Sequence, residues 1–203
     1  MSTQPAFTRA DPDDRKRSLI AATCRVLADK GAAGVSVRSI CTEAGVSPGL
    51  LRHYFDGVSD AIAQAYRETG MRISRALDDA VASAGTDPRD RLVAYLTANF
   101  RPPIASPDLL ATYIAFWSLT RSDPLVARVR TEIYADFRAP LERLLLAWRP
   151  DTGVGGIADA RIAAVALTAL IDGLWLELSL GNAPFTPDEA GALAEKWLET
   201  VAG

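Results

Sequence analysis

The fold is decided by the stretch Val35-Ser-Val-Arg-Ser-Ile-Cys-Thr-Glu-Ala-Gly-Val-Ser-Pro-Gly-Leu-Leu-Arg-His-Tyr-Phe55. It predicts two short helices, Val37–Ala44 and Pro48–Phe55, joined by a glycine that suits a left-handed helix end. Ser36 and Ser47 precede these helices and are preferred N-cap residues. The proline at the first position of the second helix loses no hydrogen bond there. This order of caps and breaks is the pattern of a helix-turn-helix.

The two short helices separate into an apolar face and a polar face at about 100° per residue. The inward positions are Val37, Ile40, Cys41, Ala44, Val46, Leu50, Leu51, Tyr54 and Phe55. The outward positions of the second helix are Pro48, Gly49, Arg52 and His53. Small residues allow close approach to a major groove, and Arg52 can bind guanine or phosphate. Spacing alone leaves open a plain helical hairpin with a solvated polar face.

Helical spacing recurs through the rest of the chain, with prolines and glycines at nearly every joint, which predicts an all-α protein of about nine helices. The other predicted helices are 13–30, 59–83, 88–100, 107–120, 124–148, 158–180 and 187–201, with a glycine-rich break at 151–156. Pro140 lies inside one of them and is expected to kink or split it.

The composition indicates a soluble, cytoplasmic globular protein. Its 203 residues carry a net charge of −3, so any nucleic-acid contact must come from a local basic surface. The first residues lack the order of a signal peptide, and Asp172 and Glu177 within 162–180 argue against a membrane span. Cys24 and Cys41 have no metal-ligand spacing and are expected to be buried free thiols rather than a disulfide.

No pattern in the sequence supports an all-helical enzyme. There is no Ser/His/Asp set, no Glu-x-x-His pair and no glycine-rich phosphate loop, and we expect neither metal nor cofactor. His53 is the only histidine and has no partner for metal binding or catalysis. It is expected to face a groove or phosphate, or else to be a partly exposed structural residue.

Several segments together resemble the TetR family of bacterial regulators. The segments that resemble its DNA-binding domain are 19–23, 31–34, 37–40, 44–51 and 53–55. Two later segments, Ala115-Phe-Trp and Ala169-Leu-Ile-Asp-Gly-Leu-Trp-Leu, resemble the choline-responsive BetI branch. The resemblance implies a DNA-binding domain over 1–58, with a flexible start at 1–12, and a ligand-binding and dimerisation domain over 59–203.

The resemblance also implies which residues lie at or near DNA. Together with His53 they are Ser36, Val37, Arg38, Ser47, Pro48, Gly49, Arg52 and Tyr54. The family usually has a phosphate-binding lysine shortly after the Tyr-Phe pair, and this chain has Val58 there. One phosphate contact is therefore expected to be missing, which puts the affinity for DNA in doubt. The slope of log affinity against log salt concentration is expected to be smaller by about one unit.

The helix at 158–180 is apolar on several sides and must be buried on several sides. By resemblance, it and 187–201 form a homodimer interface; the alternative is a central helix of a monomer. The expected interface residues are Ala166, Ala169, Leu170, Gly173, Glu177 and Trp197. A two-fold dimer presents two reading helices about 34–36 Å apart, which fits a pseudo-palindromic operator of double-stranded DNA.

Asp172 and Trp175 share one further face of that helix with Thr168 and Ser179, and aromatic residues recur on neighbouring helices. The candidate ligand-binding aromatics are Phe100, Tyr113, Phe116, Trp117, Tyr134 and Phe137. Aromatic faces beside a carboxylate suit a choline-like quaternary ammonium, although such aromatics also build ordinary cores and another small organic effector fits as well. We expect a repressor that such an effector releases; the alternative is a TetR-like carrier of small molecules or lipid that does not bind DNA.

Overall fold

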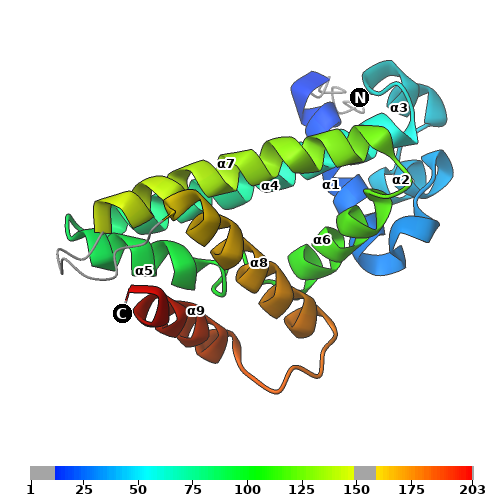
Figure 1. Cartoon of the computed structure of the whole chain (residues 1–203). Coiled ribbons are helices and arrows are strands. Elements are labelled where there is room, and N and C mark those ends of the chain that lie inside the picture. The colour runs from blue at the N-terminus through cyan, green and yellow to red at the C-terminus, as the bar shows by residue number, and fades with distance from the viewer. Residues whose placement is uncertain (1–11, 149–158, 203) are drawn as a thin grey trace, which may run out of the picture.

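A computed structural model describes residues 12–148 and 159–202. The predicted glycine-rich break at 151–156 lies outside these ranges, and so does the predicted flexible start at 1–12 except for its last residue. The described residues form nine α-helices and one short 3₁₀ helix, without strands, so the all-α prediction is confirmed (Figure 1). The elements are α1 (Pro12–Lys30), η1 (Ala32–Gly34), α2 (Val37–Ala44), α3 (Pro48–Tyr54), α4 (Val58–Ser83), α5 (Pro88–Ala98), α6 (Pro107–Leu119), α7 (Pro124–Trp148), α8 (Ala160–Ser179) and α9 (Pro187–Ala202).

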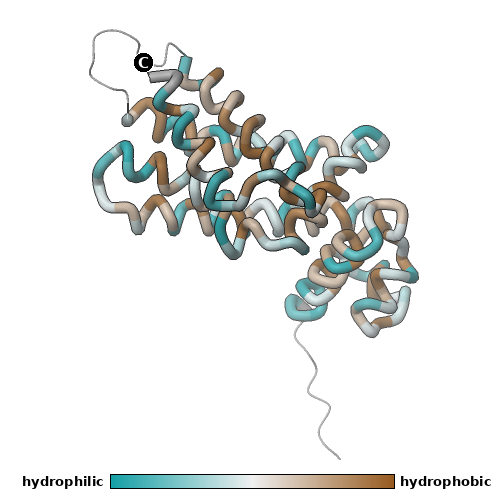
Figure 2. The backbone as a smooth tube through the Cα atoms, turned by 90° about the horizontal axis from the view of Figure 1, so that it is seen from below, coloured by the Kyte–Doolittle hydropathy of each residue, from teal (hydrophilic) through white to brown (hydrophobic). Residues whose placement is uncertain are grey.

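The helices α1 to α3 pack around a small core at one end of the molecule (Figure 2). Ser36 begins α2 with a capping box, in which its hydroxyl accepts from the Ser39 N–H at 3.0 Å. Gly45 ends α2 in the left-handed conformation at φ 66°, which a residue without Cβ adopts at least cost. The apolar residues of α2 and α3 then meet α1, and Leu19, Ile40 and Leu51 are completely buried.

The helices α4 to α9 share a second, larger core. The two longest, α4 and α7, run side by side (Figure 1). A Cβ on Gly70 of α4 would lie 2.9 Å from Ile133 of α7, so glycine is needed for this close approach. The hydrophobic residues recur along each helix, as Figure 2 shows, and the polar residues between them face outward.

Pro140 does not split α7, which continues from Pro124 to Trp148. Of the two expected outcomes, a kink or a split, the split was therefore wrong, because packing holds the helix on both sides of a missing backbone bond. Leu141 and Leu145 are buried beyond the proline, and the Tyr95 hydroxyl of α5 donates to the Phe137 carbonyl at 2.8 Å. Tertiary contacts can outweigh the local cost of proline in a helix interior.

Both cysteines are free, as expected. Cys41 is buried, whereas Cys24 is half-buried and lies 3.6 Å from the Thr69 hydroxyl. Among the described residues, only α8 is long and apolar enough to span a membrane by length and composition. Its buried face packs against α6, α7 and α9, as a core helix of a globular protein does.

Candidate functional site

The structure places the outward residues of α3 on one exposed face. Pro48, Gly49, Arg52 and His53 are all exposed, while Leu51 between them is completely buried. Figure 1 shows α3 at the end of the molecule that is remote from α9. Among the described residues, none covers this face, so it can approach a ligand as large as duplex DNA. We call it the reading face.

The other predicted DNA-binding residues surround the reading face. Ser36 and Arg38 at the start of α2 are exposed, and so is Ser47. Val37 and Tyr54 were also predicted to lie at or near DNA. Val37 is half-buried against the small core, and Tyr54 is half-buried with its ring edge-on to the His53 ring, at 4.9 Å between centroids. Val37 and Tyr54 thus support the reading face from beneath more than they project from it.

Val58, which stands where the family usually has lysine, is half-buried against the larger core. It therefore anchors the first turn of α4 by apolar packing. A different cation lies nearby: the Lys16 ammonium of α1 sits 5.9 Å from the Phe55 ring centroid, just after α3. Sequence reasoning missed Lys16, although the basic run at positions 15–17 was visible.

We call the part of the molecule formed by α1 to α3 the reading end. Two polar contacts join its helix α1 to the larger helical bundle, and a third holds the start of α4, directly after α3. The Ser59 hydroxyl at the start of α4 donates to Asp123, between α6 and α7, at 2.6 Å. Burial by itself raises the pKa of Asp123, but the hydrogen bonds from Ser59 and the backbone N–H groups of the next helix lower it overall. The Thr112 hydroxyl of α6 lies 3.3 Å from the Cys24 carbonyl of α1. The remaining contact is that between Cys24 and Thr69.

An internal cavity of about 20 Å³ lies inside the larger bundle, enough for about one water molecule. We call it the inner cavity. Five predicted ligand-binding residues line it, from α6, α7 and α8. The full lining is Leu77, Tyr95, Asn99, Tyr113, Tyr134, Phe137, Leu141, Thr168, Ile171, Asp172 and Trp175. Tyr95 and Asn99 were missed, because nothing in the pattern of α5 distinguishes them from ordinary core residues.

Asp172 is the one carboxylate in this lining. It accepts a hydrogen bond of 2.7 Å from the Tyr134 hydroxyl. Burial raises its pKa to about 6, although the Tyr134 hydrogen bond and the guanidinium groups of Arg130 and Arg138 lower it. Both guanidinium groups lie over the Tyr134 ring, at 4.0 and 5.2 Å from its centroid. The carboxylate is thus held in a desolvated site with aromatic neighbours.

The other three predicted aromatics, Phe100, Phe116 and Trp117, do not line the inner cavity. Phe100 and Phe116 are buried in the larger core, and Phe116 stacks on Tyr66 with 4.3 Å between ring centroids. Trp117 meets the Tyr113 ring edge-on at 5.9 Å. Phe116 and Trp117 thus pack against Tyr113 from outside the cavity.

Several polar atoms of this aromatic cluster are buried without a hydrogen-bond partner among the described residues. They include the Tyr113 hydroxyl, whereas the Tyr66 hydroxyl and the Trp117 indole N–H, which lack a partner of good geometry, lie close enough to interact with each other. Trp175, by contrast, donates its indole N–H to the Asn99 carbonyl at 3.0 Å, which fixes its ring at the cavity wall. Buried donors that lack an acceptor are uncommon and costly, so the cluster retains unused hydrogen-bonding capacity.

The predicted interface residues of α8 and α9 lie on a partly open surface. Of the six predicted residues, three are exposed, namely Ala169, Gly173 and Glu177, and three are half-buried, namely Ala166, Leu170 and Trp197. Four large apolar side chains are exposed on the same two helices or directly after α8: Ile162, Leu176, Leu180 and Leu193. No group of three His, Cys, Asp or Glu side chains in the described ranges is arranged to hold a metal ion.

A small helix-turn-helix unit with an exposed reading face, set on a larger helical bundle, defines a DNA-binding transcriptional regulator. The comparisons with known proteins agree. Residues 19–57 match the tetR family of bacterial regulatory proteins, and residues 88–203 match the C-terminal domain of BetI-type transcriptional repressors. The chain belongs to the TetR family and has a BetI-type C-terminal domain.

Individual relatives cover nearly the whole chain. The transcriptional regulator BetI of Burkholderia cenocepacia strain HI2424 is 32% identical over 192 residues, which are 92% of this chain and 93% of that protein. A Pseudomonas aeruginosa PAO1 protein, solved as a transcriptional regulator, is 38% identical with a TM-score of 0.87, covering 99% of this chain and 96% of the other. A Saccharomonospora viridis regulator solved in complex with choline shares the fold, with 22% identity and a TM-score of 0.76. The match covers 92% of this chain and 96% of the other.

Proposed function

We propose that this TetR-family regulator is a homodimeric repressor that a small organic cation, choline-like in its chemistry, releases from a pseudo-palindromic operator. The observation that carries the effector proposal is the desolvated Asp172 carboxylate among the rings of Tyr113, Tyr134 and Trp175. The two cations nearest to this carboxylate, Arg130 and Arg138, lie over the Tyr134 ring and are not part of the cavity lining. A quaternary ammonium supplies the charge and gains cation–π attraction from the aromatic faces.

The relatives support this chemistry. The Saccharomonospora viridis regulator, which shares the fold, was solved in complex with choline, and the curated relative is a BetI. The inner cavity of about 20 Å³ is too small for choline, so binding requires its walls to move apart. A cation therefore binds a rearranged bundle more tightly than the present packing. Because the cation binds the rearranged bundle more tightly, it shifts the equilibrium between the two arrangements of the helices toward the rearranged one.

A short path connects the inner cavity to the reading end. Tyr113 lines the cavity, and the preceding residue of α6, Thr112, contacts the Cys24 carbonyl of α1. The end of α6 leads to Asp123, which holds the start of α4 through Ser59. A shift of α6 that accommodates a cation therefore acts on α1 and α4 together. Both helices support the reading face, so its orientation changes with occupancy.

The surface of α8 and α9 supports the dimer. Leu176 and Leu180 are 42% and 63% exposed, which is costly for a regulator in water unless a partner covers them. A Cβ on Gly173 would meet no atom of its own chain within 4 Å, so the chain's own packing does not explain this glycine. A second copy of α8 crossing closely at Gly173 explains both observations. The dimer then places two reading faces on one side of the DNA.

The DNA part of the proposal is tested by selecting binders from random duplexes at low salt. We expect a palindromic sequence with half-sites about one helical turn apart. Arg52→Ala is expected to lower affinity for that sequence by about 1–3 kcal/mol, because a bidentate contact to guanine is lost. Arg143→Ala, which removes an exposed arginine from the C-terminal half of α7, is the matched control. Failure to enrich any palindrome would favour the alternative of a carrier that does not bind DNA.

The effector part is tested by thermal unfolding with choline, betaine aldehyde and a panel of uncharged alcohols of similar size. We expect the quaternary cations to raise the melting temperature and the uncharged alcohols not to. Tyr134→Phe keeps the ring but removes the hydroxyl that donates to Asp172, so it is expected to retain most of the response. No response of the wild-type chain to any quaternary amine would remove the effector proposal and leave the DNA-binding function in place.

A further inference from the structure

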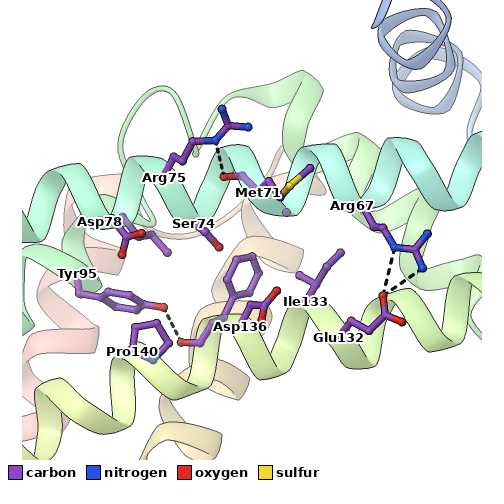
Figure 3. Close-up of a pocket in the computed structure, with 13 residues that line it drawn as sticks. Arg67, Met71, Ser74, Arg75, Asp78, Tyr95, Glu132, Ile133, Asp136 and Pro140 are labelled. Atoms are coloured by element: carbon purple, nitrogen blue, oxygen red, sulfur yellow. Dashed lines mark hydrogen bonds and ion pairs between the residues drawn. The ribbon is translucent and has the colours of Figure 1, made fainter. Parts of the chain in front are cut away.

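A second cavity lies between α4 and α7, outside the inner cavity (Figure 3). Its volume is about 510 Å³, within the range of small-molecule sites. We call it the outer groove. Its lining residues are Arg67, Gly70, Met71, Ser74, Arg75, Leu77, Asp78, Tyr95, Glu132, Ile133, Asp136, Phe137 and Pro140.

The charges of the outer groove do not balance. Arg67 forms an ion pair with Glu132 at 3.2 Å, across the two helices. Arg75 pairs with Glu68, outside the lining, at 3.6 Å, and donates to the Met71 carbonyl. Both cations of the lining are therefore matched. Asp78 of α4 and Asp136 of α7 have no ion pair or hydrogen bond in the described part of the chain.

The rest of the lining is mainly apolar. Figure 3 shows Met71, Ile133 and Pro140 along the groove, with Asp78 on one helix and Asp136 on the other. Pro140 has no N–H to give to the Asp136 carbonyl, so this backbone oxygen adds to the negative potential. An apolar groove with an excess of negative charge repels carboxylates and phosphates. It complements a molecule that is both hydrophobic and positively charged.

We infer that the outer groove is a second ligand site, which binds an organic cation with an aromatic or branched apolar part. The cation lies near Asp78 and Asp136, and the apolar part packs on Met71 and Ile133. The outer groove adjoins the inner cavity, since Leu77, Tyr95 and Phe137 line both and stand between them, while Asp78 and Asp136 line the outer groove alone. The hydrogen bond from the Tyr95 hydroxyl to the Phe137 carbonyl, at 2.8 Å, joins two of these shared residues. The inference does not depend on the effector role of Asp172.

Met71 provides a direct reporter, because the chain has only one other methionine, at position 1. The experiment uses the full chain labelled with ¹³C at the methionine methyl groups and titrates benzyltriethylammonium. We expect the Met71 methyl resonance, identified with Met71→Leu, to shift and saturate while the Met1 resonance stays in place. Phenylmethanesulfonate, an aromatic anion, is expected to leave both unchanged.

Charge variants complete the test. Asp78→Asn with Asp136→Asn is expected to weaken binding of the probe roughly fivefold, as the loss of two exposed charge contacts predicts. Asp79→Asn with Asp188→Asn removes the same charge from exposed positions outside the groove and is expected to keep the affinity. Asp172→Asn is also expected to keep it. An unchanged Met71 resonance, full affinity in the first double variant, or loss of binding in Asp172→Asn would each overturn the inference.

Discussion

Replacing Asp172 by asparagine is expected to make the effector-free protein more stable while removing its response to organic cations. The pKa of Asp172 rises from 3.8 to about 6 on folding, chiefly through burial. A difference of about 2 units corresponds to roughly 3 kcal/mol against the ionised form in the folded chain. Asparagine avoids this penalty and still accepts the Tyr134 hydrogen bond. The net gain is expected to be roughly 2 kcal/mol near pH 7.5, since the amide is itself costly to bury.

The gain depends on pH in a direction that can be checked. Asp172 holds its proton more tightly in the folded chain, so its contribution to stability is complete below the unfolded pKa and is lost as pH rises through about 6. The penalty of wild-type Asp172 falls from roughly 3 kcal/mol near pH 7.5 to roughly 1.5 kcal/mol near pH 5. The advantage of Asp172→Asn is therefore expected to shrink on acidification.

The assay is thermal or urea unfolding at fixed protein concentration, because the stability of a dimer depends on concentration. A gain of roughly 2 kcal/mol corresponds to about 4–8 °C for a chain of this size. Asp79→Asn, at an exposed site, is the control and is expected to change stability by less than about 0.5 kcal/mol. If Asp172→Asn instead destabilises the protein near pH 7.5, the carboxylate is a structural partner of Arg130 and Arg138, and the reasoning is refuted.

Three further predictions concern affinity, assembly and coupling. The affinity for choline is expected to fall about fourfold between about pH 7.5 and about pH 5.5, as Asp172 takes up its proton with a pKa of about 6; calorimetry that finds no change would contradict this. Gly173→Arg is expected to give a folded monomer in ultracentrifugation, since a Cβ there meets no atom of its own chain; a variant that stays dimeric would place the interface elsewhere. Thr112→Val is expected to bind choline normally but to weaken its effect on DNA binding by about 0.5–2 kcal/mol, and an intact effect in an operator titration would exclude the Thr112–Cys24 contact from the coupling path.

The helix-turn-helix could be predicted closely because its signals are local. The capping box at Ser36 and the left-handed Gly45 fix where α2 begins and ends, and Pro48 marks the first turn of α3, where the Ser47 side chain makes no capping hydrogen bond. The predicted ends of other helices differ from the structure by a residue or two, as fraying makes usual. Pro140 shows the limit of local rules: its own chemistry opposes a helix, and contacts from other helices decide the outcome.

The interior could be predicted only in part. The helical pattern predicts that Phe116 and Trp175 point inward. It does not predict that Phe116 fills the core while Trp175 lines a cavity. That difference depends on the distances between helices, which no single segment encodes. The outer groove was missed for the same reason, because it is formed jointly by side chains of α4, α5 and α7. Its two carboxylates lie on separate helices and form no motif.

The most direct test of the account is an anisotropy titration of the selected operator duplex with increasing choline. We expect choline to weaken operator binding by the wild-type chain at least tenfold and to leave Asp172→Asn bound. Both proteins are expected to bind the duplex equally well without choline, because Asp172 is on α8, which Figure 1 shows apart from α3. Equal release of both proteins, or release of neither, would contradict the claim that a cation held at Asp172 controls DNA binding.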